Sequence, residues 1–361
     1  MARNWVEISR AALLANLAYV RQRLAPETEV CAVVKADAYG HGAVACARVF
    51  AEAGVNWMAV TSVEEGVRLR RAGIGVRILV LAGFTAAQAA TMAADELTPA
   101  VWDAEQIEWL RAAMQPGTAR RRFAIHLKLD TGMGRLGIRP DQHGAIEAAL
   151  ARAPELRVEA VFSHLAETED RQLEALGEAR GWARQFEPEA WHLLNSEAAL
   201  AHPEWGGTLA RVGLALYGYS ADKSHNERLK PALSWKTHVI SLKQLPAGHG
   251  VGYGPAYRTM RPTRVATIAA GYADGYRRDL WSAGGDGARV LIRGVACPVI
   301  GNISMDLTTV DVTDTGEIHI GDEVVLLGPA MPATRLAEWA ATIPYEILCG
   351  LSARVERVYA A

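Results

Sequence analysis

Several polar side chains with catalytic potential stand at the ends of short apolar runs in the N-terminal two thirds of the chain. They are Lys35 in AVVKADAYGHG, Lys128 in HLKLDTGMGRLG, His164 in EAVFSH, Ser196 in WHLLNS and Arg211 in LARVG. A lysine that follows a buried strand loses hydration, so its pKa falls and its neutral amine can attack a carbonyl carbon. The pattern is typical of a site that forms a Schiff base on lysine.

Eight apolar runs, too short for helices, alternate with helical stretches and would position these side chains. The predicted strands lie near residues 30–35, 57–61, 77–81, 97–101, 123–129, 157–163, 190–194 and 208–212. Each has a crossover helix available, which predicts an α/β fold with an N-terminal (β/α)8 TIM barrel over residues 1–230. A helix over residues 9–25, with Ser9 as N-cap, is expected before the first strand.

In a (β/α)8 barrel the chemistry lies at the carboxyl ends of the strands, and the loops after strands seven and eight commonly bind phosphate. Here these loops offer the Ser196 hydroxyl and the main-chain amides of Gly213 and Leu214. A lysine opposite a phosphate site suggests pyridoxal 5'-phosphate as the cofactor. His41 and His126 are interpreted as hydrogen-bonded core residues.

After Pro231 the sequence becomes β-rich, with LSWKTHVISLKQL, ARVLIRGVACPVI and DEVVLLG separated by Gly and Asp turns. We therefore expect a separate, mainly β C-terminal domain over residues 231–361.

Composition excludes several classes of partner. The net charge is −2 and no run of five like charges occurs, so neither a nucleic-acid surface nor a membrane surface is indicated. The N-terminus has neither the apolar core of a signal peptide nor a transmembrane stretch. No metal site is expected, because the four cysteines, Cys31, Cys46, Cys297 and Cys349, are far apart. A cytoplasmic location is the simplest interpretation.

Several motifs follow one another along the chain in a fixed order: AVVKADAYGHG, KLDTGMGRLG, NS followed by RVGLALYG, VGYGPAY, GYADGY and SMD. The sequence resembles the alanine racemase family, pyridoxal-phosphate enzymes that interconvert L-alanine and D-alanine and supply D-alanine for peptidoglycan. The resemblance implies that Lys35 holds the cofactor and is one of two proton-transfer bases. It implies further cofactor contacts from Tyr39, His164, Asn195, Ser196, Arg211, Gly213, Leu214 and Tyr272. For Asn195, capping of the following helix is the alternative.

The same resemblance makes Tyr253 the second base, contributed by the partner subunit of a homodimer with shared active sites. Met305 and Asp306 of the partner would border the amino-acid substrate. Arg211 would face the pyridine nitrogen with His164 supporting it, and Arg135 would orient the substrate carboxylate. Lys128 matches a lysine that carries a carbamate in many relatives, with a rim salt bridge as the alternative.

Other functions share parts of this pattern. Pyridoxal-phosphate decarboxylases have the same architecture but carry different motifs where GNISMD and GYADGY stand here. Single-barrel pyridoxal-phosphate carrier proteins lack the β domain that holds Tyr253. A broader serine/alanine racemase or a catabolic isozyme also remains open. Asn302 and Ala353 replace an Arg and a Tyr that are common in relatives, which predicts a wider access route.

Overall fold

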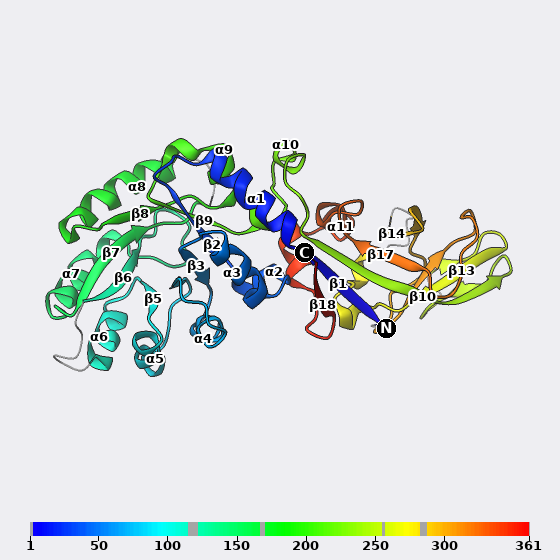
Figure 1. Cartoon of the computed structure of the whole chain (residues 1–361), viewed down its shortest axis with the longest axis horizontal. Helices are drawn as coiled ribbons and strands as arrows, with labels where there is room; N and C mark the ends of the chain where they lie inside the picture. Colours follow the sequence, from blue (N-terminus) through cyan, green and yellow to red (C-terminus); the bar gives the residue numbers. More distant parts are fainter. Residues whose placement is uncertain (1–2, 115–121, 167–169, 255–256, 282–286, 361) are drawn as a thin grey trace.

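The computed structural model describes residues 3–114, 122–166, 170–254, 257–281 and 287–360. Figure 1 shows an elongated molecule in which a sheet ringed by helices lies at one end and a second, mainly β part lies at the other. The predicted two-part architecture is therefore confirmed.

The first sheet has eight parallel strands in the described part of the chain, in the order β8-β7-β6-β5-β4-β3-β2-β9. The amides of Thr208 and Arg211 donate to the carbonyls of Trp191 and Leu194, which links the two end strands and nearly closes the barrel. The eight predicted strands are confirmed as β2 (Glu29–Val33), β3 (Trp57–Val60), β4 (Arg77–Val80), β5 (Leu97–Val101), β6 (Phe123–Lys128), β7 (Leu156–Phe162), β8 (Ala190–His192) and β9 (Leu209–Val212).

Helices connect these strands and cover the outside of the sheet, as parallel strands require. They begin at capping residues where the sequence offers them: Ser62 accepts from the Glu65 amide at 3.3 Å and Asp103 from the Glu105 amide at 2.9 Å. The helices are α2 (Lys35–Tyr39), α3 (Ala43–Glu52), α4 (Val63–Arg71), α5 (Ala89–Ala94), α6 (Ala104–Ala113), α7 (His143–Ala151), α8 (Asp170–Ala183) and α9 (Ser196–Ala201).

The start of the chain differs from the prediction. Helix α1 (Arg10–Arg23) forms, and Ser9 caps it by accepting from the Ala12 amide at 3.1 Å, as expected. The expectation that no strand precedes this helix is wrong, because β1 (Asn4–Ser9) pairs antiparallel with β10 (Leu233–Leu245) and parallel with β18 (Glu356–Ala360). The first residues thus belong to the second sheet, although they precede the barrel in the sequence.

The second sheet has the order β15-β14-β17-β10-β1-β18, and β13 and β16 join it through β10. Helix α12 (Pro344–Cys349) packs closely against the end of α2 in the barrel. Gly40, the C-cap of α2, has no room for a side chain there, because a Cβ atom would lie 2.3 Å from the Leu348 carbonyl oxygen. The remaining elements are α10 (Lys223–Asn226), β11 (Gly250–Val251), β12 (Tyr257–Arg258), β13 (Thr263–Ile268), β14 (Arg289–Ile292), β15 (Val295–Pro298), β16 (Thr308–Asp311), β17 (Glu323–Leu327) and α11 (Ala333–Trp339).

Among the helices in the described ranges, none is long and apolar enough to cross a bilayer.

Candidate active site

Lys35 lies two residues after the end of β2, at the carboxyl ends of the barrel strands. Burial and the neighbouring guanidiniums of Arg135 and Arg211 lower the pKa of Lys35, with only partial opposition from Cys349 and Glu65. At physiological pH the Lys35 amine is therefore neutral in a larger fraction of molecules than an exposed lysine would be, and the neutral amine is the form that attacks carbonyl groups.

Lys35 opens a left-handed turn. The φ angles of Ala36, Asp37, Ala38 and Tyr39 lie between 50° and 55°, although L-residues disfavour this region by roughly 1–2 kcal/mol each. Glu65 holds the turn by accepting from the Ala36 amide at 2.8 Å. The Asp37 carboxylate accepts from the Ala43 amide at 2.9 Å. The turn reverses the chain and directs Tyr39 back into the buried interior, where its ring packs against that of Tyr217 at 5.0 Å.

Tyr39, Ser196 and Gly213 meet at the predicted phosphate site. The Ser196 hydroxyl oxygen accepts from the amides of Gly213 at 2.9 Å and Ala215 at 3.3 Å, which leaves its hydrogen free to donate. A Cβ atom at Gly213 would lie 2.3 Å from the Tyr39 hydroxyl, so a larger residue here would displace the Tyr39 ring. Within the described residues the Leu214 amide has no protein acceptor. The Ser196 hydroxyl, after β8, and the Leu214 amide, after β9, are donors that suit a phosphate group.

Asn195 acts as the N-cap of α9, because its side-chain oxygen accepts from the Ala198 amide at 3.0 Å. The structure thus places the Asn195 side chain in the alternative, capping role. By capping α9, Asn195 fixes the first residue of that helix, Ser196.

Arg211 is buried on β9, and its terminal nitrogens are used by the protein. Nη1 donates to Nδ1 of His192 at 2.8 Å and to its carbonyl at 2.9 Å, and Nη2 donates to the Ser163 carbonyl at 2.7 Å. Burial lowers the pKa of Arg211 to about 10, so the group stays cationic at neutral pH. Nε has no protein acceptor in the described part of the chain, which leaves one donor for a ligand.

Two neighbours respond to the Arg211 charge. Burial, Arg211 and Lys128 lower the pKa of His164 to about 3, so this imidazole is neutral. Its Nδ1 lies 3.4 Å from Nη2 of Arg211, which places His164 beside Arg211 as predicted. Burial, Arg211 and Arg135 likewise lower the pKa of Lys128 to about 8. The strand ends therefore bring Lys35, Lys128, His164 and Arg211 together, with the exposed Arg135 close to them.

The predicted site residues of the second domain lie apart from this group. Tyr253, Met305 and Tyr272 are 76%, 53% and 42% exposed. In the described ranges, no hydrogen bond or ion pair joins any of these three side chains to the barrel. Asn302 fixes the backbone at Tyr253, because Nδ2 of Asn302 donates to the Tyr253 carbonyl at 2.9 Å.

Asp306 is held within its own domain. Arg354 donates from Nη2 to Asp306 at 2.6 Å and from Nε to the buried carboxylate of Asp274 at 2.6 Å. The amides of Tyr272 and Ala273 donate to the carbonyls of Ser304 and Met305. The loops that carry Tyr272, Met305 and Asp306 thus form one unit on the surface. Sequence reasoning missed Arg354, although it directly follows Ala353.

The barrel residues fit pyridoxal phosphate. The Lys35 amine suits its aldehyde, and the donors of Ser196 and Leu214 suit its phosphate. The Nε–H of Arg211, which has no acceptor among the described residues, suits its ring nitrogen. Within the described ranges, no cluster of three or more His, Cys, Asp and Glu side chains is placed to hold a metal ion.

Comparison with known proteins assigns the family. Residues 8–221 match the model of the alanine racemase N-terminal domain, and residues 232–359 match that of the C-terminal domain. An alanine racemase of Symbiobacterium thermophilum is 41% identical over 99% of this chain and 97% of the relative.

Two solved structures are also similar. Alanine racemase from Bacillus anthracis with bound L-Ala-P has a TM-score of 0.90 and 33% identity, over 100% of this chain and 96% of that chain. The enzyme from Bartonella henselae with covalently bound pyridoxal phosphate has a TM-score of 0.89 and 30% identity, over the full length of both chains. The chain therefore belongs to the alanine racemase family, a family of isomerases.

Proposed function

We propose that the protein is a pyridoxal-phosphate-dependent racemase that interconverts L-alanine and D-alanine. The observation that carries the proposal is the grouping of three side chains at the barrel rim. Lys35, whose pKa is lowered, lies there with Arg211 and with Ser196, whose hydroxyl can donate to a phosphate. The Bartonella henselae relative binds pyridoxal phosphate covalently, which supports the same cofactor here. When bound, the cofactor supplies an electron sink that stabilises negative charge on the substrate α-carbon.

Racemisation requires one base on each face of the α-carbon, since a proton leaves one face and returns on the other. Lys35 would serve one face. Tyr253 of a second copy would serve the other, because its exposed side chain has no described contact with its own barrel. Met305 and Asp306 would border the substrate from the same side, and Tyr272 would join the phosphate contacts.

This assignment makes the protein a homodimer with shared active sites. The exposed Tyr253, Tyr272 and Met305 would be covered by the partner's barrel, and each site would be incomplete without it. The net charge of −2 is compatible with a small zwitterionic substrate such as an amino acid. The four scattered cysteines suit the reduced environment of the cytoplasm. The D-alanine produced would serve peptidoglycan synthesis.

Arg211 can only donate hydrogen bonds, so it would hold the ring nitrogen of the cofactor in its unprotonated form, which would make the cofactor a weaker electron sink. A weaker sink favours return of the proton over transamination. Arg135 would bind the substrate carboxylate, since it is the exposed cation near Lys35. Lys128 would carry a carbamate, because its buried amine has a pKa of about 8 and three cationic neighbours that an anion would balance.

The test is to incubate the protein with pyridoxal phosphate and L-alanine and to measure D-alanine with D-amino-acid oxidase. Borohydride reduction followed by peptide mass spectrometry should find the cofactor on Lys35. Lys35→Ala should stay folded and lose both the adduct and the visible absorbance of the lysine-bound cofactor. Release of carbon dioxide without D-alanine would favour the decarboxylase alternative. A faster reaction with L-serine than with L-alanine would favour the broader racemase.

A further inference from the structure

A chain of buried hydrogen bonds leads from Arg211 through the inside of the barrel. Nη1 of Arg211 lies 2.8 Å from Nδ1 of His192, and Nε2 of His192 lies 3.0 Å from Nδ1 of His126. Nε2 of His126 lies 3.2 Å from Oε2 of Glu159. His126 is on β6 and His192 on β8, so their contact bypasses β7 and must cross the barrel interior.

A β-bulge in β7 places Glu159 at the end of this chain of hydrogen bonds. In the pairing of β6 with β7, Ile125 faces Val158 and His126 faces Ala160, which leaves Glu159 as the extra residue. A bulge redirects the side chain of its extra residue. The Glu159 carboxylate thereby reaches His126 and Arg77, a residue of the non-adjacent strand β4, and its side chain is only 4% exposed.

The direction of every hydrogen bond follows from Arg211, which can only donate. Nδ1 of His192 must therefore accept, and burial beside Arg211 keeps the pKa of His192 well below its usual value. A neutral His192 then carries its hydrogen on Nε2 and donates to His126. The pKa of the buried His126 is also lowered, so it too is neutral and donates from Nε2 to Glu159. The donor at one end of the chain of hydrogen bonds, Arg211, and the acceptor at the other, Glu159, thus favour the same tautomer of both histidines.

We propose that Glu159 is a positioning residue for Arg211, which it holds in place through the fixed tautomers of His126 and His192. If Glu159 could not accept, His126 could move its hydrogen to Nδ1. His192 would then present an N–H group to Arg211, and the guanidinium would have to turn. The catalytic importance of this contact rests on the proposed function, in which Arg211 faces the ring nitrogen.

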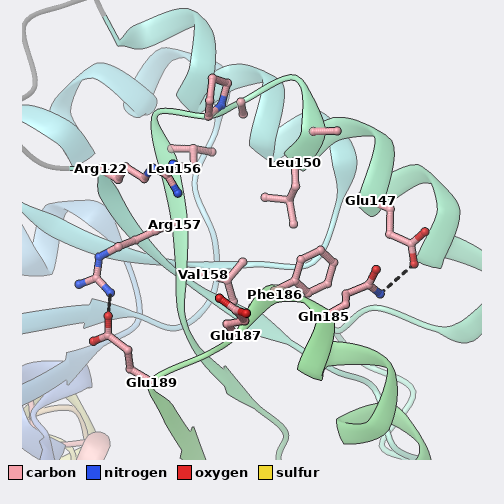
Figure 2. A pocket seen from close by; sticks show the side chains of 13 residues that line it. Arg122, Glu147, Leu150, Leu156, Arg157, Val158, Gln185, Phe186, Glu187 and Glu189 are labelled. Carbon is pink, nitrogen blue, oxygen red and sulfur yellow. Dashed lines mark hydrogen bonds and ion pairs between the residues drawn. The ribbon is translucent and has the colours of Figure 1, made fainter.

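Glu159 also has neighbours outside the chain of hydrogen bonds, which provide a control. Arg157 binds Oε1 of Glu159 at 2.6 Å and Glu189 at 2.7 Å, and lies beside a hollow of 460 Å³ at the amino-terminal ends of the strands (Figure 2). Arg157→Gln removes the ion pair with Oε1 of Glu159, but Oε2 of Glu159 can still accept the hydrogen bond from His126. It should therefore keep the tautomers and the activity unchanged.

Two substitutions of Glu159 separate hydrogen bonding from charge. Glu159→Gln loses the charge but keeps an oxygen that accepts from His126, whereas Glu159→Leu loses both. We expect Glu159→Gln to retain kcat within about threefold and Glu159→Leu to lose about 10²-fold, the scale of a misplaced catalytic contact. Equal losses in the two variants would show that Glu159 only balances the charges of its arginine neighbours, and would overturn the proposal.

Nitrogen-15 NMR of histidine-labelled protein reads the tautomers directly, with His126→Asn and His192→Asn variants to assign the signals. Both rings should be in the Nε2–H form in the wild type and in Glu159→Gln, and should become mixed in Glu159→Leu. The measurement on protein without cofactor is independent of racemase activity. Nδ1–H rings in the wild type, or unchanged tautomers in folded Glu159→Leu, would contradict the proposal.

Discussion

The left-handed turn after Lys35 predicts that a glycine at Ala36 stabilises the protein. Ala36 has φ 50° and ψ 50°, and its side chain is exposed. An L-residue in this region costs roughly 1–2 kcal/mol, whereas glycine adopts it freely but loses about 0.5–1 kcal/mol more backbone entropy on folding. The difference is a gain of about 0.5–1 kcal/mol in the free energy of unfolding. The Ala36 amide keeps its hydrogen bond to Glu65 in this variant.

The matched control is Ala148→Gly. Ala148 is also exposed but lies in the middle of the right-handed helix α7, where glycine costs about 1 kcal/mol. Urea unfolding of both variants at one protein concentration should move the midpoint up for Ala36→Gly and down for Ala148→Gly. With an m-value of about 3 kcal/mol/M, each shift is at most about 0.3 M. Two midpoints that both fall would refute the cost assigned to the left-handed turn.

Three further predictions concern the site. The pKa of Lys128, about 8 against an ordinary 10.5, means that the unfolded chain binds more protons between these pH values, so stability should rise with pH across this window. Lys128→Met should flatten that rise in buffer freed of carbon dioxide; an unchanged slope would contradict the shifted pKa. Tyr253→Phe should slow exchange of the α-proton with solvent deuterium more for L-alanine than for D-alanine, and equal slowing would contradict separate bases. Asn302→Arg with Ala353→Tyr should lower the serine-to-alanine ratio of kcat/KM by about tenfold, with Asn302→Gln as control; an unchanged ratio would show that these positions do not line the access route.

The barrel could be predicted because each buried parallel strand is a short apolar run between helical stretches. The positions of Lys35, Lys128, His164 and Arg211 followed from the rule that strand ends carry the chemistry. β1 was missed because its six residues run directly into α1, so one apolar pattern concealed two elements.

Other features depend on tertiary contacts that periodicity does not record. The left-handed turn contains no glycine, and only Gly40 and Gly42 beyond it hint at unusual backbone. His126 was interpreted as a hydrogen-bonded core residue, which is confirmed, but its partners His192 and Glu159 were not predicted. A bulge at Glu159 shifts the alternation of β7, so the sequence pattern alone could not place this carboxylate inside the barrel.

The most direct test of a site built from two subunits is complementation between Lys35→Ala and Tyr253→Phe. Each variant alone should be nearly inactive. After subunit exchange, verified by native mass spectrometry, each heterodimer would hold one site with both substitutions and one with neither. Random exchange should then restore about one quarter of wild-type activity, since half of the dimers carry one intact site of two. No recovery after complete exchange would show that Lys35 and Tyr253 act within one chain, and would contradict the shared site.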